Sequence, residues 1–114
     1  MASCIFCKIV QGQIPSEIVY EDDNVIAFRD VNPQAKVHIL IVPKKHINPM
    51  TEINEKQAKV MSDIFLAAKE IAGRQKIGGR GFRMIMNVGS DAGQEVEHLH
   101  VHLLGGEKLG KLVG

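Results

Sequence analysis

The chain has 114 residues, 45% of them hydrophobic and 24% charged, which is typical of a single globular domain over residues 1–114. Fourteen Lys and Arg against thirteen Asp and Glu leave a net charge of +1, so the composition excludes a protein that holds nucleic acid through excess positive charge. No apolar run approaches the roughly 18 residues that span a bilayer, and the amino end lacks the pattern of a secretory signal, so we expect a cytoplasmic protein with no membrane association.

The first half of the chain predicts a short helix followed by three strands. Apolar residues at helical spacing predict a helix over residues 4–10, which Gly12 to Pro15 ends. Residues 17–20 and 25–28 flank the acidic turn 21–24 and predict a β-hairpin. Residues 37–42 (VHILIV) are almost all aliphatic, as expected for a strand buried on both faces.

The second half predicts one long helix and two further strands. Asn54 can cap a helix that runs to about Gln75, with an apolar face of Met61, Ile64, Phe65, Ala68 and Ile71. Strands are expected over residues 82–87 and 96–104, and residues 105–114 form an irregular tail. Strands interrupted by a single long helix predict an α+β domain with a mostly antiparallel sheet and the helix on one face.

Three histidines alternate with apolar residues in the last expected strand, at His98, His100 and His102. In a strand these imidazoles would share one face, about 6.6 to 7 Å apart. Like charges on one stripe cost stability unless a ligand, a metal or a reaction uses them. Two interpretations follow: chelation of a catalytic metal, or attack on phosphorus by one neutral imidazole while its neighbours donate to the developing oxyanion.

The loop just before the histidines favours the phosphorus chemistry. Residues 89–94 (GSDAGQ) contain glycines that let backbone N–H groups approach an anion, while Asn87, Ser90 and Gln94 add neutral donors. Alone, such a loop is more often a plain turn. Beside three histidines it indicates a phosphate site.

Three further features are open to two interpretations each. His38 either makes a structural hydrogen bond within the buried strand or joins the histidine cluster. Asp30 either ends the preceding strand as a turn residue or accepts both hydroxyls of a ribose. A set of apolar residues belongs either to the core or to the wall of a base pocket, and it comprises Ile5, Phe6, Ile9, Phe28 and Val31.

The only cysteines are Cys4 and Cys7. In a reducing compartment this C-x-x-C spacing indicates metal ligands or a redox pair rather than a structural disulfide. A pair of buried thiols that act as small apolar residues is the structural alternative.

At these residues the chain resembles the histidine-triad (HIT) superfamily, whose signature of three histidines separated by apolar residues is met from His98 to Leu104. The resemblance runs from CIFCKI through YEDD, AFRD, HILIVPKKH and NVGSDAGQ to HLHVHLLGG. In its length and in its Gly-Gln loop, the chain resembles members of the nucleotide-binding Hint branch of this superfamily. A histidine rather than glutamine at 102 argues against the hexose-1-phosphate uridylyltransferases.

The resemblance implies a five-stranded sheet with one long helix and a short N-terminal helix, assembled as a homodimer. It implies that His100 is the nucleophile, with His38 and His102 beside it, and that Asp30 binds the ribose. The phosphate contacts implied are Asn87, Gly93 and the amide of Val96. Glu95 stands where some members carry a serine that touches the scissile group.

The expected activity is therefore hydrolysis of purine nucleoside phosphoramidates through a nucleotidyl-histidine intermediate, with AMP, GMP or an adenosine derivative bound and no catalytic metal. The alternatives are a non-catalytic nucleotide-binding scaffold dimer, a dinucleoside polyphosphate hydrolase, or a catalytic metal enzyme. The resemblance also implies a structural zinc held by Cys4, Cys7, His46 and His98, since family members with cysteines at this position bind zinc with the equivalent histidines.

Overall fold

The computed structural model describes residues 4–111, so residues 1–3 and 112–114 of the expected domain lie outside the described residues. Cys4 caps the short helix α1 (Ile5–Val10), and a hairpin of β1 (Ile18–Glu21) and β2 (Val25–Arg29) follows. Next come β3 (Val37–Pro43), the 3₁₀ turn η1 (Glu55–Gln57), the long helix α2 (Ala58–Arg74), β4 (Phe82–Ile85), the 3₁₀ turn η2 (Ser90–Ala92) and β5 (Val101–Gly105). None of the helices within residues 4–111 has the length and apolarity needed to cross a membrane.

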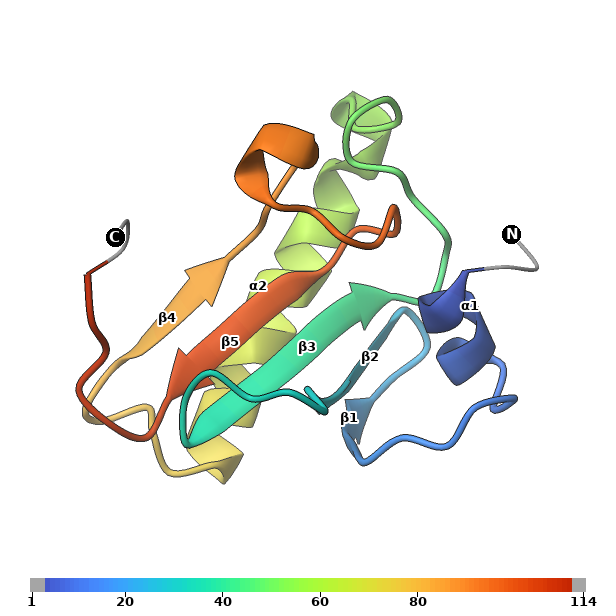
Figure 1. Ribbon diagram of the computed structural model, residues 1–114. Coiled ribbons are helices and arrows are strands. Elements are labelled where there is room, and N and C mark those ends of the chain that lie inside the picture. The colour runs from blue at the N-terminus through green and yellow to red at the C-terminus, as the bar shows by residue number, and fades with distance from the viewer. Residues whose placement is uncertain (1–3, 112–114) are drawn as a thin grey trace.

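The five strands form one antiparallel sheet in the order β1-β2-β3-β5-β4, which confirms the predicted α+β class. The chain leaves β3, crosses one face of the sheet as α2, and returns as β4 at the far edge (Figure 1). The last strand, β5, then enters between β3 and β4. Strands far apart in sequence are thereby paired at the centre of the sheet.

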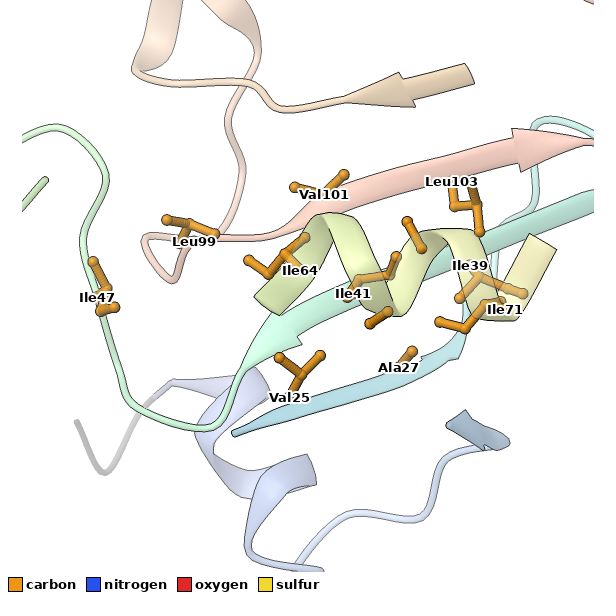
Figure 2. Close-up of a cluster of buried hydrophobic side chains, with 12 residues drawn as sticks. Val25, Ala27, Ile39, Ile41, Ile47, Ile64, Ile71, Leu99, Val101 and Leu103 are labelled. Atoms are coloured by element: carbon orange, nitrogen blue, oxygen red, sulfur yellow. The ribbon is translucent and has the colours of Figure 1, made fainter. Parts of the chain in front are cut away.

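Side chains of β3 alternate between two apolar clusters on opposite faces of the sheet. Leu40 and Val42 pack with Phe6 and Ile9 of α1. The other face packs against α2, and Figure 2 shows members of this larger cluster between the helix and the strands. Burying one such aliphatic side chain contributes about 1.5 to 3 kcal/mol. The cluster comprises Val25, Ala27, Ile39, Ile41, Ile47, Ile64, Ala67, Ala68, Ile71, Leu99, Val101 and Leu103.

The long helix differs from the prediction at its start and on its apolar face. The Asn54 side chain accepts the N–H of Lys56 (2.8 Å), so it caps η1, and the α-helix begins only at Ala58. Phe65 was expected in the core but is 59% exposed. Successive residues of a helix point about 100° apart around its axis. Because Ile64, Ala68 and Ile71 face the core, the side chain of Phe65 points toward solvent.

The last strand is also shorter than predicted. It begins at Val101 rather than residue 96, so only His102 of the three histidines lies in a strand. The reason lies in β3, which pairs with β5 as far as Ile41↔Val101 and ends at Pro43, a residue with no N–H to donate. The alternation of faces nevertheless persists, because Leu99 stays in the α2-side core and its N–H donates to the carbonyl oxygen of Ile47 (2.7 Å).

Candidate active site and metal cluster

A cavity of about 540 Å³ lies on the face of the sheet opposite α2, within the size range of small-molecule sites. Its walls come from α1, the segment after β2, the strands β3 and β5, and the loop before β5. Ser90 and Gln94 do not line it, but the other residues predicted for catalysis and nucleotide binding do: His38, His100, His102, Asp30, Asn87, Gly93, Glu95, Val96, Ile5, Phe6, Ile9, Phe28 and Val31. The structure thus brings together residues spread over nearly 100 positions of sequence.

The tautomer of His100 is fixed by one short contact. Its Nδ1 lies 2.7 Å from the backbone carbonyl oxygen of His98. A carbonyl oxygen can only accept, so Nδ1 carries a proton, and in the neutral form of the ring Nε2 keeps the free lone pair. The ring is buried and meets the edge of the Phe6 ring, with centroids 5.1 Å apart. The contact therefore fixes the orientation of the His100 ring and the tautomer of its neutral form.

The other two cavity histidines form a directed hydrogen-bond chain. The backbone N–H of Gln34 donates to His38 Nδ1 (3.0 Å), so the proton of neutral His38 must sit on Nε2. His38 Nε2 lies 2.9 Å from His102 Nδ1, which must then accept. The proton of His102 is left on Nε2. Of the two interpretations of His38, the structure supports membership of the cluster.

Burial holds both rings of this chain in the neutral form. Burial lowers the pKa of His38, and the nearby carboxylate of Asp30 opposes that shift. Burial, together with the neighbouring rings of His100 and His38, lowers the pKa of His102 to about 4, and the carboxylate of Asp30 opposes this shift. The 3.4 Å approach of Asp30 Oδ2 to His38 Nε2 is therefore a contact with a neutral ring rather than an ion pair.

Asp30 serves the turn and faces the cavity at once. Its Oδ1 accepts the N–H of Asn32 (2.8 Å), and its own N–H donates to the carbonyl oxygen of His38 (3.0 Å). The turn role predicted from sequence is thus present. The carboxylate still lines the cavity, so the geometry allows the ribose role as well.

The side chain of Gln94 stabilises the loop before β5 through two hydrogen bonds. Gln94 Oε1 accepts the N–H of Gly89 (2.7 Å), while Gln94 Nε2 donates to the carbonyl oxygen of Val96 (2.9 Å). Gln94 is therefore bonded within the loop, and Ser90 is exposed. Neither side chain lines the cavity, so the structure does not support their predicted donation to a phosphate there. Gly93 has φ +80°, a left-handed conformation that lets the backbone turn beside the cavity.

A second cluster lies next to the cavity and consists of Cys4, Cys7, His46 and His98, whose ligand atoms are all within 4.8 Å of one another. Cys4 Sγ and Cys7 Sγ lie 3.4 and 3.6 Å from His98 Nδ1, and Cys7 Sγ lies 3.2 Å from His46 Nδ1. These distances approach the S···N edge of about 3.6 Å in a tetrahedral zinc site. The four residues lie close enough to bind a metal.

The tautomer of His98 also fits a metal ligand. Its Nε2 lies 2.8 Å from the carbonyl oxygen of Pro43, so Nε2 carries the proton and the Nδ1 lone pair faces the thiols. Burial and the adjoining Cys4 thiol raise the pKa of Cys7, so a cation is needed to hold it as a thiolate at neutral pH.

Asp30, His38 and His102 form another group compact enough for a metal. Here the proton arrangement is different, because the Gln34 N–H occupies His38 Nδ1 and keeps the proton on Nε2, the atom that would face the ion. These residues therefore suit a hydrogen-bond chain better than a metal site.

Several residues that line the cavity were not predicted from the sequence: Ile14, Pro15, Ser16, Arg29, Asn32, Gln34 and Leu40. For Leu40 a signal existed, since it alternates with His38 in a strand and lies opposite His102. Gln34 acts through its backbone N–H, which no side-chain pattern reveals.

Comparison with known proteins agrees with this arrangement. The HIT domain family matches residues 11–109. The purine nucleoside phosphoramidase of Escherichia coli (strain K12) is 44% identical over 109 residues, covering 96% of this chain and 92% of that protein. A crystal structure of a HIT family hydrolase from Legionella pneumophila has a TM-score of 0.94 at 45% identity, covering 98% of this chain and 100% of that one. A histidine triad protein from Clostridium difficile has a TM-score of 0.94 at 50% identity, with 97% and 96% covered.

The chain belongs to the HIT family. This confirms the resemblance stated from the sequence, and the relatives named for an activity support a hydrolase.

The depressed pKa values predict how stability depends on pH. His102 titrates near 6.5 when unfolded and at about 4 when folded, so the unfolded chain binds more protons between these values and stability falls as pH is lowered through that window. Urea unfolding should show that His102→Gln loses less stability than the wild type between pH 7 and 5, by about 1 to 2 kcal/mol. The Cys/His cluster is the same in both proteins, so its contribution to the pH dependence of stability cancels in the difference. Identical pH slopes would contradict a neutral, buried His102.

Proposed function

We propose that this HIT family hydrolase is a purine nucleoside phosphoramidase that binds AMP, GMP or an adenosine derivative and forms a covalent bond between His100 and phosphorus. The observation that carries the proposal is the 2.7 Å contact from His100 Nδ1 to the His98 carbonyl oxygen. In the neutral ring, this contact leaves Nε2 as the unprotonated nitrogen of a buried side chain that lines the cavity. An imidazole held in this tautomer is ready to attack without first losing a proton.

Different parts of the cavity suit the base, the ribose and the phosphate of a nucleotide. One wall is apolar and aromatic, formed by Ile5, Phe6, Ile9 and Phe28, and suits a purine base. Asp30 stands beside it as acceptor for the ribose hydroxyls. The turn with Gly93, together with Asn87 and the amide of Val96, receives the phosphate in this proposal.

The reaction has two steps in the proposed mechanism. Nε2 of His100 forms a bond to the α-phosphorus as the phosphorus–nitrogen bond of the substrate breaks, and the departing amine takes up a proton from solvent. Water then attacks the same phosphorus, loses a proton to solvent, and displaces His100 to release the nucleoside monophosphate. Each step exchanges one bond at phosphorus for another.

The directed chain supports His102 rather than His38 as the proposed hydrogen-bond donor to the phosphoryl group. The proton on His38 is held between His102 Nδ1 (2.9 Å) and Asp30 Oδ2 (3.4 Å). His102 Nε2–H has no such commitment and belongs to a ring that lines the cavity beside His100, with ring centroids 5.2 Å apart. His102 is therefore the group proposed to donate a hydrogen bond to the phosphoryl oxygen, and His38 positions it.

The charges around the cavity favour an amine over a polyphosphate as leaving group. Among the described residues that line it, Arg29 is the one Lys or Arg, and its guanidinium is bonded to Glu17 (2.7 Å) and Gln75 (3.0 Å). The acids Asp30 and Glu95 line it as well. A tri- or tetraphosphate chain would bring several negative charges to a site with no uncommitted cation, which argues against dinucleoside polyphosphates.

A structural zinc is the proposed occupant of the Cys/His cluster. Two thiols and two imidazoles are a common ligand set of closed structural zinc sites. Zinc bound there supplies folding stability and ties α1, which carries part of the base wall, to the segment before β5. Its ligands must remain reduced thiols, which agrees with the predicted cytoplasmic location.

A homodimer is the proposed assembly. β4 is an edge strand, and the apolar side chains of Phe65 and Leu66 on α2 are 59% and 62% exposed. Pairing of β4 with its copy would extend the sheet and cover apolar surface of α2 in the same interface. A sedimentation mass equal to one chain at micromolar concentration would contradict it.

Turnover of adenosine 5′-phosphoramidate tests the proposed function. The wild type should release AMP and should prefer this substrate by kcat/KM to diadenosine tetraphosphate. His100→Ala should lower kcat at least about 1,000-fold while AMP binding, measured by calorimetry, is retained, because the nucleophile contributes mainly in the transition state.

Each part of this expectation can fail separately. AMP binding without wild-type turnover would favour a scaffold protein, and a better kcat/KM for diadenosine tetraphosphate would place the chain among polyphosphate hydrolases. Near-normal turnover by His100→Ala would remove His100 as nucleophile.

Zinc content and melting temperature test the metal cluster. The purified chain should hold about one zinc, and Cys4→Ser should lower both its zinc content and its melting temperature because a bound ligand stabilises the folded state. Lys8→Gln on the same helix is the matched control and should change neither. Chelation that abolishes turnover while leaving melting unchanged would instead indicate a catalytic metal.

A further inference from the structure

A second cavity of about 760 Å³ shares no residue with the first and collects positive charge. We call it the basic groove and define it by its charged residues: Lys36, Lys76, Arg80, Arg83, Lys108 and the single acid Glu107. The whole chain carries fourteen basic and thirteen acidic side chains, so this local excess is not a reflection of composition. Within residues 4–111, Lys36, Lys76, Arg80 and Lys108 make no ion pair.

The cations come from separate parts of the chain that the fold brings together. Lys36 precedes β3, Lys76 and Arg80 lie between α2 and β4, Arg83 is in β4, and Lys108 follows β5. These segments meet at the end of the sheet where β5 finishes and β4 begins (Figure 1). Gathering like charges from distant segments is unfavourable unless an anion compensates them.

Hydrogen bonds and close packing hold the segments that form the walls of the basic groove. Glu107 Oε2 accepts the backbone N–H of Lys36 (2.7 Å), so the acid is used to tie the segment after β5 to the start of β3. Arg83 donates to the carbonyl oxygen of Gly110 (3.0 Å). A Cβ at Gly105 would come 2.8 Å from the buried side chain of Ile77, so these two segments are in close contact.

Lys76 occupies a position where lysine is costly. The N–H groups of Lys76 and Ile77 donate to the carbonyl oxygens of Gly73 and Ala72 (3.2 and 3.0 Å), the pattern that ends a helix with a left-handed residue, usually glycine. Lys76 has φ +61°, a left-handed conformation that is unfavourable for a residue with a side chain. Attraction to the carboxyl end of α2 accounts for a cation here, but not for Lys36, Arg80 or Lys108.

We propose that the basic groove binds a linear inorganic oligophosphate, of the size of pyrophosphate or tripolyphosphate. Several ammonium and guanidinium groups around one polar cavity match an anion with several charges on a short chain. The half-buried Phe82 is the one aromatic side chain that lines the groove among the described residues, so there is no platform for stacking bases of a nucleic acid. The carboxylates of an acidic peptide carry one charge each and match the cluster less well.

Calorimetric titration with tripolyphosphate tests the basic groove, using the full chain with and without AMP. The double substitution Arg80→Gln with Lys108→Gln should weaken binding at least about 10-fold, since both side chains are exposed and contribute mainly charge. Lys56→Gln with Lys69→Gln removes the same charge from exposed positions outside the groove and is the matched control. It should change the affinity less than about 2-fold, and AMP should not displace tripolyphosphate.

Four results would overturn the proposal: no measurable binding, equal weakening in both double variants, displacement by AMP, or tighter binding of a hexaglutamate peptide or an oligothymidylate than of tripolyphosphate. None of these depends on catalysis at His100, so failure of the basic groove and failure of the proposed function are separate outcomes.

Discussion

The pairing of β3 with β5 is the constraint on which the rest of the molecule depends. Its register sets Leu40 opposite His102 and His38 opposite Leu104, so the two imidazoles lie diagonally across the strand pair with Nε2 and Nδ1 2.9 Å apart. Their neighbours Ile39 and Leu103 are fully buried against the α2 side. A slip of one residue would bury His102 there and expose Leu103, so hydrophobic packing on one face fixes the chemistry on the other.

Beyond the end of that pairing, His98 links the two clusters. Its carbonyl oxygen orients His100, while its Nδ1 faces the thiols of Cys4 and Cys7. Its Nε2 is bonded to the carbonyl oxygen of Pro43, the residue at which β3 ends. In the proposed zinc-bound protein, the metal therefore stabilises the same segment that presents the nucleophile, without touching the reacting atoms.

Local patterns predicted the order of the elements correctly, and the family resemblance named the four Cys and His residues that lie close enough to bind a metal. The residues expected at the site lie around one cavity, while their roles stay predictions. The sequence pattern overestimated the strand before Val101, since the end of a ladder depends on the partner strand and on Pro43. It assigned Gln94 to phosphate, although both polar atoms of that side chain bond within its own loop. The direction of the histidine chain could not be read at all, because it is set by a backbone N–H at Gln34.

Rapid quenching of the enzyme during turnover of an adenosine phosphoramidate tests most directly whether His100 carries the nucleotide. Quenching in alkali followed by intact-mass and fragment mass spectrometry should reveal an AMP adduct on His100 that is stable in base, is lost in acid and is absent from His100→Ala. An adduct on His102 or His38, or single-turnover release of AMP with no adduct at any time, would contradict a nucleotidyl intermediate on His100.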